Sequence, residues 1–406
     1  MNCNSFIAAI LAIPLALVAV PAAAEPGADD FRADAQSFEA LVNQRYAYLE
    51  RFQDATFRLT PKLQAEAEAV HDSRGLLLFL EHAVALLGDH HAITGASFRD
   101  SWALVPSYAD LWAVRDEAGF RITDIKPGSP ADGIVSPGDR LLAIAGVPAA
   151  QAVSDFWQDI GVDAPTPDQQ AYAARILLAG RRDRERRFTL AHAKAAPREI
   201  ELPNLYAFRR EAGDRPAISL ASHGNTVRIR FNDSLGDTGT IAVFDNAMAS
   251  LKPSDRVVID LADTGSGGNT TVGRAIMGWF VDLPRPYQMH SSPEEFRETG
   301  IARQWAEYVL PRAGKHHPGP VVVHVGRWTG SMGEGLAVGF DALGFAVCGT
   351  SMAGLLGAIE DNRLERTGEV VKFPTERLST MGGIPRENFR PRSLDDRACA
   401  ADRATL

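Results

Sequence analysis

Between residues 216 and 350 short apolar runs alternate with amphipathic stretches, and this alternation restricts the fold more than any other feature of the chain. The runs are rich in β-branched residues and read NTVRIRFND, DRVVIDLAD, GPVVVHVGR and GFAVCGT. Helical spacing of apolar residues marks the stretches between and after them, at 240–251, 270–281, 296–310 and 332–343. Strands that alternate with helices predict a layered α/β core with largely parallel strands. Ligand sites in such sheets lie beyond the carboxyl ends of the strands.

Two further domains are predicted before this core, which we place at 216–406. Residues 28–88 repeat apolar side chains at helical spacing, which predicts an N-terminal helical domain over 25–108. The next segment contains short strand-like runs separated by Gly/Pro turns, and one or two further strands continue to about residue 202. We therefore predict a β-rich domain over 109–203.

The first residues of the chain resemble a secretory signal. An apolar stretch ends in PAAA, an Ala-x-Ala pattern that predicts cleavage after Ala24 and a signal peptide over 1–24. The stretch has no preceding Lys or Arg, and an uncleaved anchor is the alternative, but Pro14 and Pro21 interrupt it. We expect a periplasmic or secreted protein with no integral membrane segment after signal removal.

The charge balance and the cysteine content restrict the partners, metals and cofactors that we expect for this chain. The chain has 42 Lys and Arg against 51 Asp and Glu, a net charge of −9, which argues against a nucleic-acid-binding surface. Cys348 and Cys399 remain after signal removal and either pair or stay as buried thiols. There is no H-E-x-x-H motif and no Cys/His cluster, so we expect no metal and no cofactor.

The stretch RWTGSMGEGLAVGF places Ser331 between a strand-like run and a helical one. Ser331 is either an ordinary helix cap or a nucleophile. Gly330 permits a sharp turn, and the free N–H groups at a helix N-terminus favour negative charge. A nucleophilic serine also needs a base and donors for the oxyanion.

A second glycine cluster supplies candidate donors. DTGSGGNTT follows the strand-like run VVIDL and contains Gly267 and Gly268. We expect the N–H of Met332 and that of Gly267 or Gly268 to form an oxyanion hole. A phosphate-binding loop is the alternative, but neither dinucleotide nor P-loop motif is present.

Three ordered blocks resemble the serine peptidases of the C-terminal-processing and tricorn-core type. GFRITDIKPGSPADGIVSPGDRLLAIAG is similar to their PDZ domain, and VVIDLADTGSGGNTT to their strand-plus-glycine block, with Ala262 in place of the usual Arg. VVVHVGRWTGSMGEGLAVGF with VCGTSMAGLLGAIE resembles their nucleophile block and the turn that follows it. The resemblance covers about residues 110–390 and implies a crotonase-like α/β core with an inserted PDZ-like domain at 109–203.

The resemblance also implies which residue is the base. The Ser–Lys branch is excluded because Leu355 stands where its lysine lies, and Lys372 in VVKFP is a poor substitute. The tricorn-like branch uses histidine, and LLGDHHAITG matches its D-x-H pattern with His91 as base and His90 as the variable residue. That branch orients its histidine through a network that includes a glutamate. MGGIPRENFRP supplies Glu387 for it, with Glu334 and Glu360 as alternatives.

The predicted function is that of an exported serine endopeptidase acting on polypeptides captured by the PDZ-like domain. Ser331 attacks, His91 transfers the proton, and Glu387 holds the histidine tautomer. A non-catalytic peptide- or ligand-binding protein on the same scaffold is the alternative, and another acyl-transfer or ester-hydrolysis reaction is a third.

Overall fold

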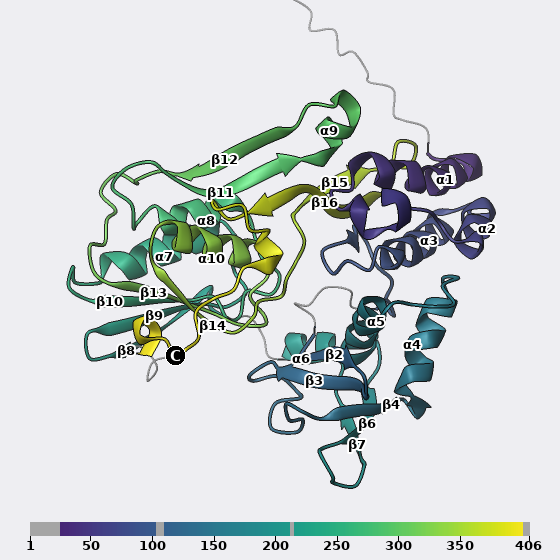
Figure 1. Ribbon diagram of the computed structural model, residues 1–406, viewed down its shortest axis with the longest axis horizontal. Helices are drawn as coiled ribbons and strands as arrows, with labels where there is room; N and C mark the ends of the chain where they lie inside the picture. Colours follow the sequence, from purple (N-terminus) through teal and green to yellow (C-terminus); the bar gives the residue numbers. More distant parts are fainter. Residues whose placement is uncertain (1–24, 103–108, 212–214, 401–406) are drawn as a thin grey trace, which may run out of the picture.

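The computed structural model describes residues 25–102, 109–211 and 215–400. The predicted signal peptide therefore lies outside the described residues. Figure 1 shows an α/β core with a long pair of strands above it, and the N-terminal helices and the β-rich domain beside it.

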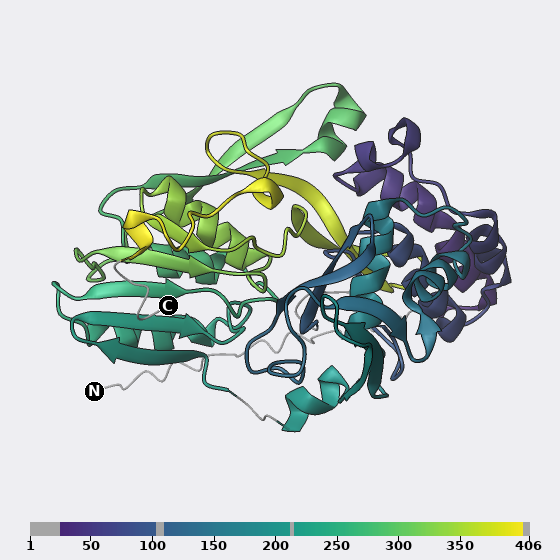
Figure 2. The same ribbon diagram turned by 60° about the horizontal axis from the view of Figure 1, so that its bottom comes forward.

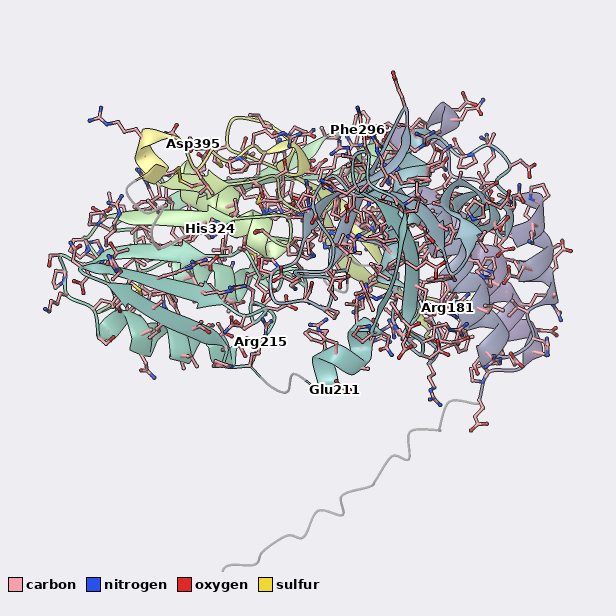
Figure 3. All side chains as sticks on the ribbon, turned by 90° about the horizontal axis from the view of Figure 1, so that it is seen from below. Arg181, Glu211, Arg215, Phe296, His324 and Asp395 are labelled. Atoms are coloured by element: carbon pink, nitrogen blue, oxygen red, sulfur yellow. A yellow bond between two sulfur atoms is a disulfide. The ribbon has the colours of Figure 1, made fainter. Side chains whose placement is uncertain are left out.

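The core is built on a five-stranded sheet in the order β14-β13-β10-β9-β8. Neighbours pair in parallel except at β8, which is antiparallel to β9. Asp260 lies opposite His324 in this register, and Figure 3 shows His324 within the sheet. This arrangement confirms the predicted α/β class. The strands are β8 (Ile218–His223), β9 (Thr226–Phe231), β10 (Arg256–Asp260), β13 (Val321–Val325) and β14 (Ala346–Gly349).

Three helices cover one face of this sheet and separate it from a second sheet. They are α7 (Gly239–Ala249), α8 (Thr270–Met277) and α10 (Met332–Ala342). The second sheet runs β1-β16-β11-β12, with β15 also paired to β16 (Figures 1 and 2). Its strands are β1 (Ile93–Thr94), β11 (Arg285–Ser292), β12 (Arg303–Val309), β15 (Ala358–Arg363) and β16 (Val370–Ser379). Phe244, Ile276, Leu336 and Tyr287 are fully buried in one cluster that joins helices and sheets.

The helix expected at 296–310 is wrong over most of its length. The structure has a short helix α9 (Pro293–Thr299) and then strand β12. Gly300 ends the helix in the left-handed conformation (φ 73°), and the residues after it pair with β11 in an antiparallel register. Tertiary pairing overrides the local helical pattern here.

The N-terminal region folds into three helices, α1 (Ala28–Arg45), α2 (Pro61–Ala69) and α3 (Ser73–Leu86), with two short 3₁₀ turns, η1 (Leu49–Arg51) and η2 (Gln53–Ala55). Thr60 and Asp72 cap α2 and α3 by accepting backbone N–H groups. Strand β1 follows α3 and pairs with β16, with Ile93 opposite Lys372. This pairing joins the N-terminal region to the second sheet of the core.

The β-rich domain is a six-stranded sheet in the order β2-β3-β4-β6-β7, with β5 paired to β4. Strands β2 and β7 are its two outer strands, and helix α5 lies beside β2 (Figure 1). The elements are β2 (Leu111–Asp116), β3 (Gly119–Ile125), β4 (Arg140–Ile144), β5 (Val147–Pro148), α4 (Ala149–Gln158), α5 (Pro167–Ala179), β6 (Arg186–Ala191) and β7 (Arg198–Leu202). Helix α6 (Leu205–Glu211) follows on the way to the core.

The C-terminal segment returns to the edge of the core sheet. After β16 it forms the 3₁₀ turn η4 (Arg386–Asn388) and ends in α11 (Arg397–Ala400). A disulfide joins Cys348 of β14 to Cys399 of α11. No helix among the described residues is both long and apolar enough to span a bilayer.

Candidate active site

Ser331 lies at the tight turn between the end of β13 and the start of α10. Its backbone is left-handed (φ 50°, ψ −114°), a conformation that non-glycine residues avoid and that often accompanies functional sites. Gly330 must lack a side chain, because a Cβ there would lie 2.7 Å from the carbonyl oxygen of Gly265. The sequence therefore builds a strained turn that leaves the Ser331 hydroxyl only partly buried.

The second glycine cluster lies directly against this turn. Thr264 N–H donates to Trp328 O at 3.0 Å, and Gly330 N–H donates to Thr264 O at 3.3 Å. A Cβ on Gly267 would lie 2.2 Å from the Ser331 Cβ and 3.0 Å from the Met332 nitrogen. The structure thus brings the two glycine-rich segments together, as the sequence predicts.

The two glycines of the cluster differ in the state of their N–H groups. Gly267 N–H already donates to Thr264 O at 3.0 Å, so it is not a free oxyanion donor. Gly268 is exposed. In the described part of the chain no acceptor engages the N–H of Gly268 or of Met332. These two groups remain the candidate oxyanion donors, and Gly267 contributes close packing.

His91 meets Ser331 although 240 residues separate them. The distance from His91 Nε2 to Ser331 Oγ is 3.1 Å, within the reach of general-base catalysis. Asp89 shapes the turn after α3, because its carboxylate accepts the His91 N–H at 2.8 Å and the Tyr46 hydroxyl at 2.9 Å. The D-x-H pattern therefore has a local cause: its aspartate fixes the backbone of the histidine.

The partner of the second ring nitrogen determines the tautomer. His91 Nδ1 lies 2.5 Å from the carbonyl oxygen of Leu356. A carbonyl can only accept, so Nδ1 carries the proton and Nε2 directs its lone pair toward the Ser331 hydroxyl. Burial, reinforced by the charge of Arg386, lowers the pKa of His91 to about 4, against the opposing effect of the Leu356 and Gly357 backbone. The ring is therefore neutral near pH 7 and able to accept a proton.

The structure does not join Glu387 to His91, which corrects the predicted role. Glu387 lies on η4, and its Oε2 is buried with no hydrogen-bond partner among the described residues. Burial raises the pKa of this carboxyl group. The group that orients the base is a backbone carbonyl, which has no side-chain signature in a sequence.

The other residues considered for the base and its orienting group have different partners. His90 Nε2 accepts from Arg175 Nε at 2.8 Å. Leu355 is buried, Lys372 binds Asp361 at 2.8 Å, and Glu360 binds Arg45 at 2.7 Å. None of these four side chains has a hydrogen bond to Ser331 or His91 in the described structure.

Glu334, weighed only as an alternative, is fully buried under the turn, and its carboxylate accepts the Ser331 N–H at 2.9 Å. Its place three residues after Ser331 is a capping-box signal, which predicts this contact with the first helical turn. Arg386 was missed. It is buried beside the site, and its Nη2 donates to Leu355 O at 3.1 Å and Gly357 O at 2.7 Å.

The β-rich domain contacts the segment that bears the nucleophile. Trp328 Nε1 donates to the carbonyl oxygen of Ala109 at 2.7 Å, just before β2. The guanidinium groups of Arg175 and Arg327 lie 4.5 and 4.7 Å from the centre of the Trp112 ring. The site therefore lies where the three regions of the chain meet.

The described residues contain no group of three or more His, Cys, Asp or Glu side chains placed to hold a metal ion. The chemistry that the arrangement supports is nucleophilic, with a serine, a neutral imidazole and two free backbone donors.

Comparisons with known proteins show which solved structures have a similar fold. No family model and no curated sequence matches the chain. Solved structures do. The crystal structure of mature CPAF has a TM-score of 0.54 at 13% identity, covering 90% of this chain and 92% of that one. The photosystem II D1 C-terminal processing protease has a TM-score of 0.54 at 15% identity, covering 90% and 93%. The chain thus shares its fold with mature CPAF and the D1 C-terminal processing protease.

Proposed function

We propose that this protein is a serine peptidase with Ser331 as nucleophile and His91 as base. The observation that carries the proposal is the 3.1 Å contact between His91 Nε2 and Ser331 Oγ at a strained turn. A histidine with a purely structural role could bind a serine in an ordinary backbone conformation. The positive φ of Ser331 is unusual for a residue with a side chain, and such outliers cluster at functional sites. The fold shared with the photosystem II D1 C-terminal processing protease supports the same reading.

The reaction follows from the geometry. His91 Nε2 takes the Ser331 proton as Oγ attacks the substrate carbonyl carbon, and the carbonyl oxygen becomes an oxyanion. The N–H groups of Met332 and Gly268 stabilise that oxyanion. His91 then gives its proton to the leaving amine, and water hydrolyses the acyl-enzyme by the same steps. Leu356 O keeps Nδ1 protonated throughout.

Substrate capture is proposed at the β-rich domain, in the manner of a PDZ domain. Strand β2 is one of the two outer strands of its sheet, and an extended peptide could add to that edge. A peptide on β2 would lie close to the nucleophile, because Trp328 contacts Ala109 immediately before this strand.

Export to an oxidising compartment is also proposed. The predicted signal over 1–24 motivates it, and the Cys348–Cys399 disulfide is of the kind that persists outside the cytosol.

The first experiment measures hydrolysis of an unfolded, fluorophore-quenched polypeptide by wild type, Ser331→Ala and His91→Asn. Each variant is expected to lose on the order of 10⁴-fold in kcat, because nucleophile and base act as a unit. Ser222→Ala and His223→Asn, two exposed residues of β8, are matched controls that should retain full rates. Equal rates for Ser331→Ala and wild type would remove the nucleophile assignment.

A fluorophosphonate probe separates the peptidase from the binding protein. Covalent labelling of wild type, absent in Ser331→Ala, is expected if the serine is activated. A folded wild-type protein that neither reacts with the probe nor cleaves peptides would favour the binding protein instead.

A further inference from the structure

The carboxylate of Glu334 accepts three backbone N–H groups at once. It takes Ser331 N–H at 2.9 Å, Gly354 N–H at 2.8 Å and Leu355 N–H at 3.1 Å. The residue is fully buried on α10, so water does not compete for these bonds. A buried carboxylate is costly unless it is well hydrogen-bonded, and this one is.

A simple helix cap does not explain this arrangement. In a capping box the side chain at the third helical position accepts only the N–H of the cap residue, here Ser331. The other two donors come from a loop 20 and 21 residues further along the chain. Glu334 therefore connects two separate backbone segments rather than finishing its own helix.

That loop, residues 354–357, carries the group that orients the base. Leu356 O contacts His91 Nδ1 at 2.5 Å. Glu334 binds the N–H groups of Gly354 and Leu355, and Arg386 binds the carbonyl oxygens of Leu355 and Gly357. The loop is thus held from both sides by buried, oppositely charged side chains, and the carbonyl between those points is the one that meets His91.

We propose that Glu334 is a positioning residue that fixes the nucleophile turn and the base-orienting loop as one rigid unit. It thereby does through the backbone what the carboxylate of a Ser-His-Asp triad does through direct contact. The proposal rests on the proposed peptidase function. In the step it supports, the Ser331 proton moves to His91 Nε2, Nδ1–H stays bonded to Leu356 O, and Glu334 exchanges no proton.

The negative charge of Glu334 also interacts with the positive charge of Arg386. Arg386 acts on both Glu334 and His91, and it disfavours the imidazolium that forms during catalysis. Burial raises the pKa of Glu334 to about 7, against the lowering effect of Arg386 and its three N–H donors.

The test compares Glu334→Gln with Glu360→Gln, a matched control at an exposed carboxylate of β15. In a glutamine an NH₂ group replaces one carboxylate oxygen, so the side chain can no longer accept all three N–H groups, while its volume is kept. We expect kcat to fall roughly 100-fold with KM within about twofold, near the lower end of a general base's contribution. Glu360→Gln should keep both constants, and both variants should melt cooperatively.

The pH profile gives a readout that a merely structural role would not move. As pH falls through about 7, Glu334 gains a proton and loses acceptor capacity, so wild-type kcat/KM should decline there. His91, with its pKa lowered to about 4, would set a limb near pH 4 if Glu334 had no role. In Glu334→Gln the limb near pH 7 should disappear, leaving a lower plateau down to about pH 4.

The outcomes separate this proposal from the proposed function. Cleavage that depends on Ser331 but is unchanged in Glu334→Gln overturns the positioning role alone. If Glu334→Gln fails to fold, Glu334→Asp is measured instead, because its shorter carboxylate keeps the charge but withdraws from the loop at 354–357. A kcat equal to that of wild type overturns the role equally, and a loss of kcat with KM unchanged supports it. Absence of cleavage and of probe labelling in wild type overturns the peptidase function, and this proposal with it.

Discussion

Ser331 holds a left-handed backbone that costs about 1–3 kcal/mol for a residue with a side chain. Its neighbours keep it there. Glu334 accepts its N–H, its carbonyl accepts the Gly335 N–H, and Gly267 lies so close that no Cβ would fit between them. The strain directs Oγ to His91 and leaves the N–H of Met332 beside the site.

Replacing Gly267 tests this close approach. In Gly267→Ala the new Cβ would lie 2.2 Å from the Ser331 Cβ and 2.7 Å from Oγ, so the two loops must separate. We expect kcat to fall about 100-fold or more, as when one oxyanion donor is removed. Steady-state kinetics of the folded variant check this.

The control for that variant is Gly224→Ala. Gly224 has a similar left-handed φ (61° against 67°), but a Cβ there would meet open space. It should cost about 1 kcal/mol of stability and leave kcat unchanged. Similar kcat losses in both variants would mean that backbone strain, not contact with Ser331, explains the effect.

At the scale of elements, the C-terminal segment is bound to an edge of the core. Gly349 N–H donates to Arg392 O at 2.9 Å, and Arg392 N–H donates to Val347 O at 2.8 Å. The disulfide then closes a loop of 51 residues that includes β15, β16 and η4. The turn that carries Arg386 is therefore fastened at both ends, by β16 on one side and the disulfide on the other.

Removing this disulfide should lower stability more than activity. For a loop of this length the chain-entropy model assigns about 4 kcal/mol to the cross-link. We expect a Cys348→Ser/Cys399→Ser double variant to lose up to this amount in urea unfolding while KM stays unchanged. Reductant should shift the wild-type midpoint and leave that of the variant in place. A wild-type midpoint that ignores complete reduction would contradict the prediction.

At the scale of the whole molecule, the site is assembled from three regions. The N-terminal region contributes His91, the core contributes Ser331 and Leu356, and the β-rich domain places Trp112 between them. Arg175 contacts both the Trp112 ring and His90, the neighbour of the base. Arg327, four residues before Ser331, contacts the same ring and donates to Met352 O at 2.7 Å.

Trp112→Ala should therefore reduce activity through the alignment of the regions. We expect kcat/KM to fall about tenfold, equal to about 1.4 kcal/mol of transition-state stabilisation. Trp305→Ala is the matched control, because Trp305 also stacks with an arginine, Arg303, but lies on β12. It should lose stability without losing kcat/KM. Equal losses of kcat/KM in the two variants would exclude a specific role of Trp112.

Much of the architecture could be predicted because it depends on local preference. Apolar periodicity identified α7, α8 and α10 and the parallel strands of the core. It failed at β12, where Gly300 and antiparallel pairing with β11 decide the outcome. It did not predict the second sheet as a layer, because β16 pairs with β1 and with β11, and both pairings join segments far apart in the chain.

The sequence pointed to Ser331, Gly268 and Met332 through short motifs that reflect what a turn or helix start requires of its residues, and to His91 through the D-x-H pattern of the resemblance. Only the tertiary structure decided how they work together. It engages the Gly267 N–H, leaves Glu387 Oε2 without a hydrogen bond among the described residues, and gives the orienting role to the carbonyl of Leu356. These outcomes depend on backbone groups brought together across as many as 265 residues. A backbone carbonyl is the same in every residue, so its role arises only when the chain has folded.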